Sequence, residues 1–129
     1  MNTSIPTIIF SVHQHDFSAH ENVLTNAYAK SFLYHHGIPY FNATGCHKGQ
    51  REAAFVLQDV ADNLDAVRHL AVAYQQESIL RIDANRQARL ETPQGDLIET
   101  LGKFQVTCEC SAKKHDAWTK CNGRYWVTA

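Results

Sequence analysis

The segment NATGCHKGQREAAFVL, residues 42–57, places a thiol, an imidazole and a carboxylate beside two glycines, just before an apolar run. Gly45 and Gly49 permit backbone conformations closed to other residues and let a ligand approach the main chain. Free backbone N–H groups in such a loop can bind anionic groups. Glu52, at the start of a strand, is held by a rigid element and can meet a cation. These residue types predict a ligand-binding loop, with a plain hairpin loop of solvated charges as the alternative.

The composition is that of one globular domain, residues 1–129. A formal net charge of -1 argues against a nucleic-acid partner, since proteins that bind phosphates usually carry a basic excess. The N-terminal segment MNTSIPTIIF has no basic region, and no apolar run approaches the ~20 residues that a membrane span needs. We therefore expect a protein of the cytoplasm without a membrane partner, whose cysteines are mostly reduced thiols.

Hydrophobic periodicity and turn residues predict two helices and several short strands. Ser18 and Glu21 have the spacing of a capping box, and Gly37 is the natural end of the helix that follows. Asp59 is placed to cap the second helix. The expected helices are 18–36 and 59–74, and the expected strands are 5–12, 40–44, 53–58, 78–83, 86–92, 103–110 and 123–128.

The order of these elements is β-α-β-β-α-β, followed by C-terminal strands. This order predicts an α+β protein with a ferredoxin-like sandwich, in which two helices cover one face of an antiparallel sheet. The second face would then stay uncovered unless the C-terminal strands or another subunit cover it. We therefore expect burial across an oligomer interface.

The segment HQHDFSAH offers possible metal ligands at His13, His15, Asp16 and His20. Metal ligation needs three or four converging side chains, and this spacing fits no standard motif. Solvated histidines at the end of a strand are the favoured interpretation.

The C-terminal segment CECSAKKHDAWTKC raises a second metal hypothesis, a zinc site made by Cys108, Cys110, His115 and Cys121. Structural zinc sites usually have at least two residues between the first two cysteines. A C-terminal hairpin with reduced cysteines, turning at residues 113–116, is the favoured interpretation.

The segment TGCHKGQREAAFVL resembles the TGCY region, and the glutamate and apolar strand that follow it, of the bacteriophage S-adenosylmethionine (SAM) lyases, once described as SAM hydrolases. LDAVRHLAVAYQQESIL is similar to the second helix of that family and the strand behind it. GKFQV and GRYW also resemble family segments, and all four occur in the family's order over residues 40–127. The chain departs from the family at His47, where the family has a tyrosine, and in a shorter loop before the glutamate.

The resemblance implies a ferredoxin-like, PII-like homotrimer with substrate in the clefts between subunits. It also implies a lyase in which the carboxylate of SAM attacks its own Cγ, giving 5′-methylthioadenosine and homoserine lactone. SAM is then the substrate, and neither a cofactor nor a metal is required. In a host cell, such a phage enzyme would deplete the methyl donor and act as an anti-restriction protein.

The resemblance assigns roles to particular residues. Glu52 is the expected catalytic acid, holding the α-ammonium or lying near the sulfonium, and His47 lines the reacting centre in place of the family's tyrosine. Gln76 would donate from its amide to the substrate carboxylate or to the base. The remaining substrate-binding residues, which would contribute backbone contacts, are Thr44, Gly45 and Cys46.

Two hypotheses from other classes remain open at this point. The first is a non-catalytic, PII-like trimer that binds a small molecule and has lost activity with the tyrosine. The second is a small zinc-binding interaction protein.

Overall fold

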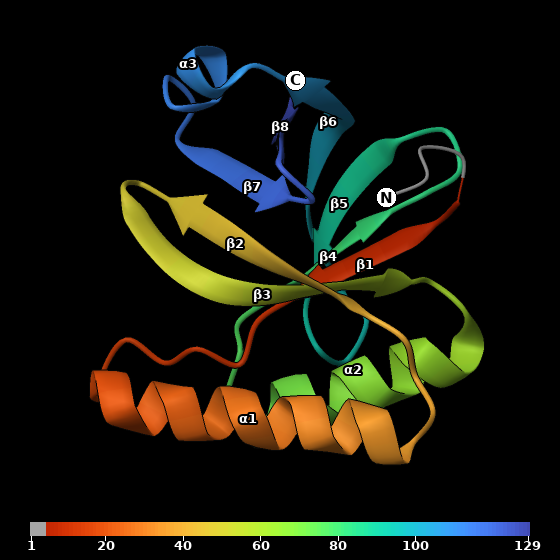
Figure 1. The fold of residues 1–129 in the computed structure, drawn as a ribbon. Coiled ribbons are helices and arrows are strands. Elements are labelled where there is room, and N and C mark those ends of the chain that lie inside the picture. The colour runs from red at the N-terminus through yellow and green to blue at the C-terminus, as the bar shows by residue number, and fades with distance from the viewer. Residues whose placement is uncertain (1–4) are drawn as a thin grey trace.

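The computed structural model describes residues 5–129, in which eight antiparallel strands close into a barrel and three helices lie outside it (Figure 1). The strands follow one another around the barrel in the order β1-β3-β2-β7-β8-β6-β5-β4, and β4 pairs with β1. The elements are β1 (Thr7–Phe10), α1 (Ala19–His35), β2 (Phe41–His47), β3 (Gln50–Gln58), α2 (Ala61–Ala73), β4 (Ile79–Ile82), β5 (Gln87–Glu91), β6 (Leu97–Thr107), α3 (Glu109–Ala112), β7 (Ala117–Cys121) and β8 (Arg124–Thr128).

The predicted ferredoxin-like sandwich is wrong, because the sheet closes on itself. The first six elements occur in the expected order, but β5 and the long strand β6 continue the sheet beyond β4. Irregular register between β5 and β6 accompanies this continuation, as expected where a sheet bends. Strand β7, which was not among the expected strands, then pairs with β2 and completes the circle. The face that we expected to be uncovered is the interior of the barrel.

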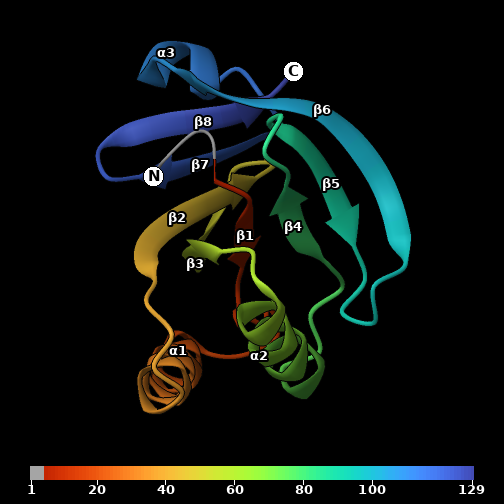
Figure 2. The same ribbon diagram turned by 90° about the vertical axis from the view of Figure 1, so that its right-hand side faces the viewer.

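Alternate residues of the strands form two apolar layers. In β1, Ile8 and Phe10 face the helices whereas Ile9 faces the barrel interior. Figures 1 and 2 show α1 and α2 side by side below β1 and β3. The layer against the helices contains Ile8, Phe10, Val12, Ala29, Leu33, Ile38, Phe55, Leu57, Ala66, Val67, Leu70, Ala71 and Ile79. The interior layer contains Ile9, Ala54, Val56, Ile82, Ala88, Phe104, Cys121 and Trp126.

The two long helices begin in different ways. Helix α1 begins with the predicted capping box, in which the Ser18 hydroxyl accepts from the Glu21 N–H and the Glu21 carboxylate accepts from the Ser18 N–H. Helix α2 does not use Asp59 as its cap. The Asp59 carboxylate instead accepts a hydrogen bond of 2.8 Å from Nε of Arg81, so a contact across the fold replaces the expected local one.

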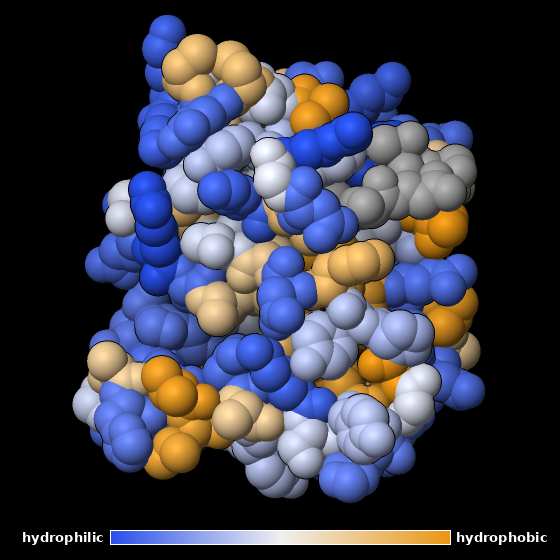
Figure 3. Space-filling view, in the orientation of Figure 1, coloured by the Kyte–Doolittle hydropathy of each residue, from blue (hydrophilic) through white to orange (hydrophobic). Residues whose placement is uncertain are grey.

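The surface of the molecule keeps apolar side chains exposed on several elements, α1 and β6 among them. Figure 3 shows hydrophobic atoms over α1, at the lower left, where Val23 and Leu24 are exposed. Leu97, Ile98 and Val106 are exposed along β6. Within residues 5–129, no helix combines the length and the apolar character that crossing a membrane requires.

Candidate functional site

The segment from residue 42 to 57 is a β-hairpin, so the long loop expected between the two strands is wrong. Strands β2 and β3 pair continuously up to His47 and Gln50. The turn consists of Lys48 and Gly49 alone, with φ values of 51° and 81°. Two consecutive positive φ values are typical of the two-residue hairpin turn that matches the twist of the strands. Strand β2 also pairs with β7, so its backbone N–H groups are engaged by the sheet and do not form a cradle.

The register of the hairpin places Gly45, His47 and Glu52 on the same face of the sheet, toward the barrel interior. Gly45 lies directly opposite Glu52, and His47 follows Gly45 by two residues. A Cβ atom at position 45 would lie 4.0 Å from Cγ of Glu52, so the glycine leaves open space above this side chain. Glu52 is half-buried and His47 is exposed. Both predicted catalytic residues therefore share one surface.

Thr44 and Cys46 alternate with these residues and face the opposite side of β2. Cys46 is buried, and it packs with Trp118 and Val127 against Ala112 of α3. The side chains of these two predicted binding residues therefore point away from that of Glu52, although Cys46 lines a cavity that Glu52 also lines.

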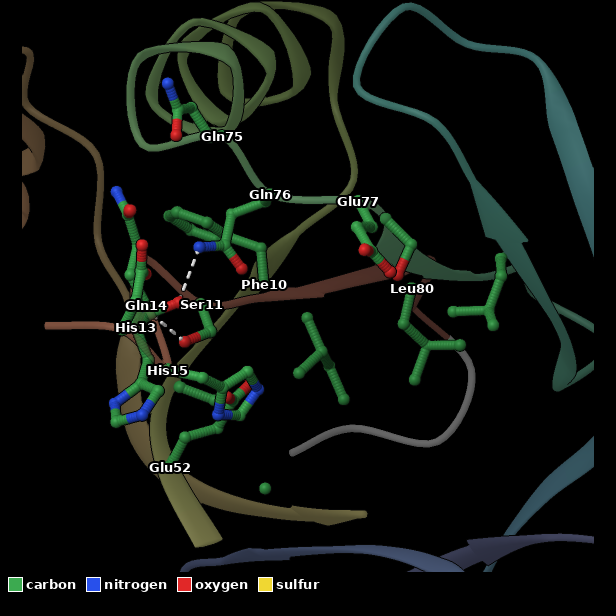
Figure 4. A pocket seen from close by; sticks show the side chains of 16 residues that line it. Phe10, Ser11, His13, Gln14, His15, Glu52, Gln75, Gln76, Glu77 and Leu80 are labelled. Carbon is green, nitrogen blue, oxygen red and sulfur yellow. Dashed lines mark hydrogen bonds between the residues drawn. The ribbon is translucent and has the colours of Figure 1, made fainter. Parts of the chain in front are cut away.

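A cavity of about 540 Å³ opens above Glu52, within the size range typical of small-molecule sites. Its walls come from β3, from the connection that follows β1 and from the segment that follows α2 (Figure 4). Figure 4 shows Glu52 on one side of the cavity and Glu77 on the other. A second cavity, also of about 540 Å³, extends toward β7 and β8. The residues that line both are His15, Gly45, Glu52, Glu77, Ser78, Leu80 and Leu90.

The lining of the two cavities is acidic. Asp16, Glu52 and Glu77 line the first, and Glu99 joins the second. Among the described residues, neither cavity is lined by a lysine or an arginine. Charges of one sign in a concave site raise the local concentration of ligands of the opposite sign. The site is therefore suited to a cationic small molecule.

Gln76, a predicted substrate-binding residue, lines the first cavity, but its amide nitrogen is engaged by the protein. Nε2 donates to the main-chain oxygen of His13 at 2.8 Å (Figure 4). It also donates to the main-chain oxygen of Tyr74 at 3.3 Å. Ser11 also holds this segment, because its hydroxyl donates to the Ala53 carbonyl and accepts from the His13 N–H. Gln76 and Ser11 thus fix the chain between β1 and α1 at the edge of the cavity.

The histidines of that segment, which the sequence suggested only as metal ligands or as solvated residues, are further functional candidates. His13 and His15 line the first cavity, with ring centroids 5.2 Å apart. Within residues 5–129, no group of three histidine, cysteine or acidic side chains is arranged to hold a metal ion. The available sequence signal was their position, since polar residues directly after a buried strand often line a site at the end of a sheet.

The cysteines of the zinc hypothesis do not converge. Cys121 is buried in the interior layer of the barrel, and its thiol donates to the Asn42 carbonyl at 3.8 Å. Cys108 and Cys110 are exposed at the start of α3. The hypothesis of a four-ligand site is therefore not supported by the fold.

The fold and the cavity define this protein as a small β-barrel whose acidic site is suited to a compact cationic molecule. The description of one family agrees with such a site, since the model of the S-Adenosylmethionine lyase family matches residues 8–129. The chain therefore belongs to the S-adenosylmethionine lyase family, as the resemblance in its sequence predicted. The family name indicates an enzyme that acts on SAM. No curated protein matches the sequence significantly.

Proposed function

We propose that this protein cleaves SAM to 5′-methylthioadenosine and homoserine lactone. In this step a carboxylate oxygen of SAM forms a bond to its own Cγ. The bond between Cγ and the sulfonium sulfur breaks, and its electron pair stays on sulfur, which becomes a neutral thioether. The nucleophile is already ionised at neutral pH, so the reaction requires no strong base and no cofactor.

The observation that carries the proposal is the acidic cavity around Glu52. SAM has a sulfonium and an ammonium group against one carboxylate, so its net charge is positive. Carboxylates without neighbouring lysines or arginines favour binding of such a molecule over a neutral or anionic analogue. In the proposal, Glu52 attracts the ammonium or lies beside the sulfonium and holds the substrate in a folded conformation.

Orientation supplies most of the expected rate enhancement. Well-oriented intramolecular reactions gain about 7–11 kcal/mol of barrier reduction from proximity alone. The interior layer next to the cavity, with Leu80 and Leu90 in its wall, would keep water from the reacting atoms. Interactions that bind the folded conformer more strongly than the extended one are those that accelerate the reaction.

Incubation of the purified protein with SAM tests the proposal. Chromatography should show methylthioadenosine together with homoserine lactone or its hydrolysis product, at a rate proportional to enzyme concentration. If SAM raises the melting temperature without turnover, the protein is instead the non-catalytic binding protein considered above. If SAM neither stabilises the protein nor disappears, both forms of the proposal fail.

Substitution of His47 by tyrosine tests the departure from the family pattern. In the proposal His47 lines the reacting centre on the same face as Glu52, so His47→Tyr should keep or raise kcat/KM for SAM cleavage. His47→Phe is the matched control, because it has the same ring without the hydroxyl. A several-fold loss in both variants would show that the imidazole has a role of its own.

Gln76→Glu is expected to raise KM about 3- to 10-fold, because it removes the donor of both hydrogen bonds, and the shorter one alone contributes about 0.5–1.5 kcal/mol. A carboxylate cannot donate to the His13 carbonyl, so the segment at the edge of the cavity loses its anchor. Gln75→Glu is the control, since it adds the same charge at the neighbouring, exposed position in the cavity wall. Equal effects of the two substitutions would attribute the change to charge alone.

The proposal includes a homotrimer with sites between subunits and a role in phage counter-defence. The exposed apolar side chains on β6 support an interface, and Ile98 of this strand also lines the second cavity. Light scattering should give three times the 14.6 kDa mass of the chain. Expression in a bacterial host should lower its SAM level and its DNA methylation, whereas a monomeric mass or unchanged methylation would contradict the respective part.

A further inference from the structure

Two exposed thiols meet at the start of α3, outside both cavities. The sulfur atoms of Cys108 and Cys110 lie 3.1 Å apart, within hydrogen-bond distance. The Ser111 N–H also donates to the Cys108 sulfur at 3.4 Å. Neither cysteine lines the cavity above Glu52 or its extension. A pair of thiols in contact at the surface is therefore present that the proposed reaction does not use.

The other two cysteines, Cys46 and Cys121, differ from this pair because they are buried. Cys46 is 8% exposed and packs under α3, and Cys121 is 3% exposed in the barrel interior. Burial raises the pKa of the Cys121 thiol, which keeps it protonated and unreactive. Accessible thiol chemistry is thus confined to the pair at 108 and 110.

The two exposed sulfurs are also unequal. Because the Cys110 thiol and the Ser111 N–H both interact with the Cys108 sulfur, the pKa of Cys108 is lowered. The pKa of Cys110 is raised by the same partner. A thiolate is the attacking form in thiol–disulfide exchange. Cys108 is therefore the expected nucleophile, and Cys110 is the thiol that resolves the intermediate.

We propose that Cys108 and Cys110 form a dithiol–disulfide couple that a small-molecule disulfide, such as oxidised glutathione, converts to an intramolecular disulfide. The Cys108 sulfur attacks one sulfur of the oxidant, breaks its S–S bond and releases the first glutathione. Cys110 loses its proton and attacks the Cys108 sulfur, and the second glutathione leaves. The two protein thiols together lose two electrons and two protons. One glutathione disulfide gains them and becomes two glutathione thiols, so atoms and electrons balance.

The position of the pair makes this couple readily reversible. An exposed disulfide between residues only two apart closes a small ring, and exposed or strained disulfides are the labile ones. Helix α3 is anchored through Ala112 to Cys46, Trp118 and Val127, which face the outside of the strands that carry the site. The couple thus lies on the reverse side of β2 and β7, and it does not depend on the proposed SAM reaction.

The test equilibrates the full-length protein in glutathione buffers of different ratios, alkylates the free thiols and digests with trypsin. Cleavage after Lys103 and Lys113 releases a peptide, residues 104–113, that contains Cys108 and Cys110 and neither of the other cysteines. With increasing oxidised glutathione this peptide should lose both alkylation sites and the mass of two hydrogen atoms. Cys46 and Cys121 serve as internal controls and should be alkylated only after unfolding.

Cys110→Ser provides the second arm, since it removes the resolving thiol but keeps the nucleophile. It should accumulate a stable glutathione adduct at Cys108, while Cys108→Ser should react more slowly at Cys110. Two results would overturn the proposal. One is a wild-type protein that carries glutathione on both cysteines without an internal disulfide, and the other is a pair that stays fully alkylatable in oxidised glutathione alone.

Discussion

Glu52→Gln is expected to lower kcat/KM for SAM cleavage by about 100- to 1000-fold, the usual cost of removing one group that stabilises charge in an active site. Glutamine keeps the shape of the side chain and removes its negative charge. The Glu52 carboxylate has no ion pair with another described residue. The substitution should therefore leave folding unchanged, so that the loss is one of activity. Methylthioadenosine formation and the melting temperature, measured together, check this result.

Asp16→Asn is the matched control for this prediction. Asp16 also lines the cavity, but it is exposed, and solvent screens its charge. Its replacement should change kcat/KM by a few-fold at most. Near-normal activity of Glu52→Gln, or equal losses in both variants, would mean that the acid at position 52 has no special role.

Glu91→Gln has the largest expected effect on stability. Glu91 is 5% exposed, and its carboxylate accepts from Arg89 at 2.5 Å and from Arg81 at 3.2 Å, with Arg68 at 3.6 Å. Breaking a buried ion pair typically costs about 3–5 kcal/mol. Solvent reaches Arg68 and Arg89, so we expect the free energy of unfolding to fall by about 2–3 kcal/mol. Urea denaturation at neutral pH measures this change.

Glu91→Gln should also weaken the dependence of the free energy of unfolding on pH in acid. Burial alone would raise the pKa of Glu91, but hydrogen bonds and charges from Arg89 and Arg81 outweigh it and lower the pKa from 4.5. A lowered pKa means that the stabilisation is fully present above pH 4.5 and is lost as the pH falls through the value in the folded protein. Wild-type stability should therefore drop more steeply below pH 4.5 than that of Glu91→Gln.

Glu109→Gln is the control for both measurements. Glu109 pairs with Lys113 at 2.6 Å, but both side chains are exposed. Solvent screens an exposed ion pair, so this variant should stay close to the wild type in stability. If Glu91→Gln is no less stable than Glu109→Gln, the cluster of arginines around Glu91 does not stabilise the fold.

Features set by neighbouring residues were predictable from the sequence. The Ser18 and Glu21 capping box depends on contacts within one helical turn, and it formed as expected. Asp59 failed as a cap because Arg81, distant in sequence, binds its carboxylate. Barrel closure also depends on distant partners, since β2 pairs with β7 more than seventy residues later. No local pattern contains that information.

In the candidate site, too, features set by residue type were predictable and features set by packing were not. Gly45, His47 and Glu52 were selected from their residue types, and the hairpin register places them on one face. The two-residue turn at Lys48 and Gly49 was missed, because a lysine in a left-handed conformation is uncommon and the sequence pattern favoured a longer loop. The sequence suggested the histidine segment only as a metal site or as solvated residues, whereas its place in the cavity wall follows from the packing of the segment after α2 against it.

Closure of the sheet has a consequence for how copies of the chain meet. Each of the eight strands within residues 5–129 has a hydrogen-bonded neighbour on both sides along at least part of its length. Residues 50–54 of β3 and 97–102 of β6 lack a partner on one side, so a second copy finds only short rows of free backbone on which to extend the ladder. Self-association of this protein is therefore expected to depend mainly on side chains, where single substitutions can abolish it without unfolding the subunit.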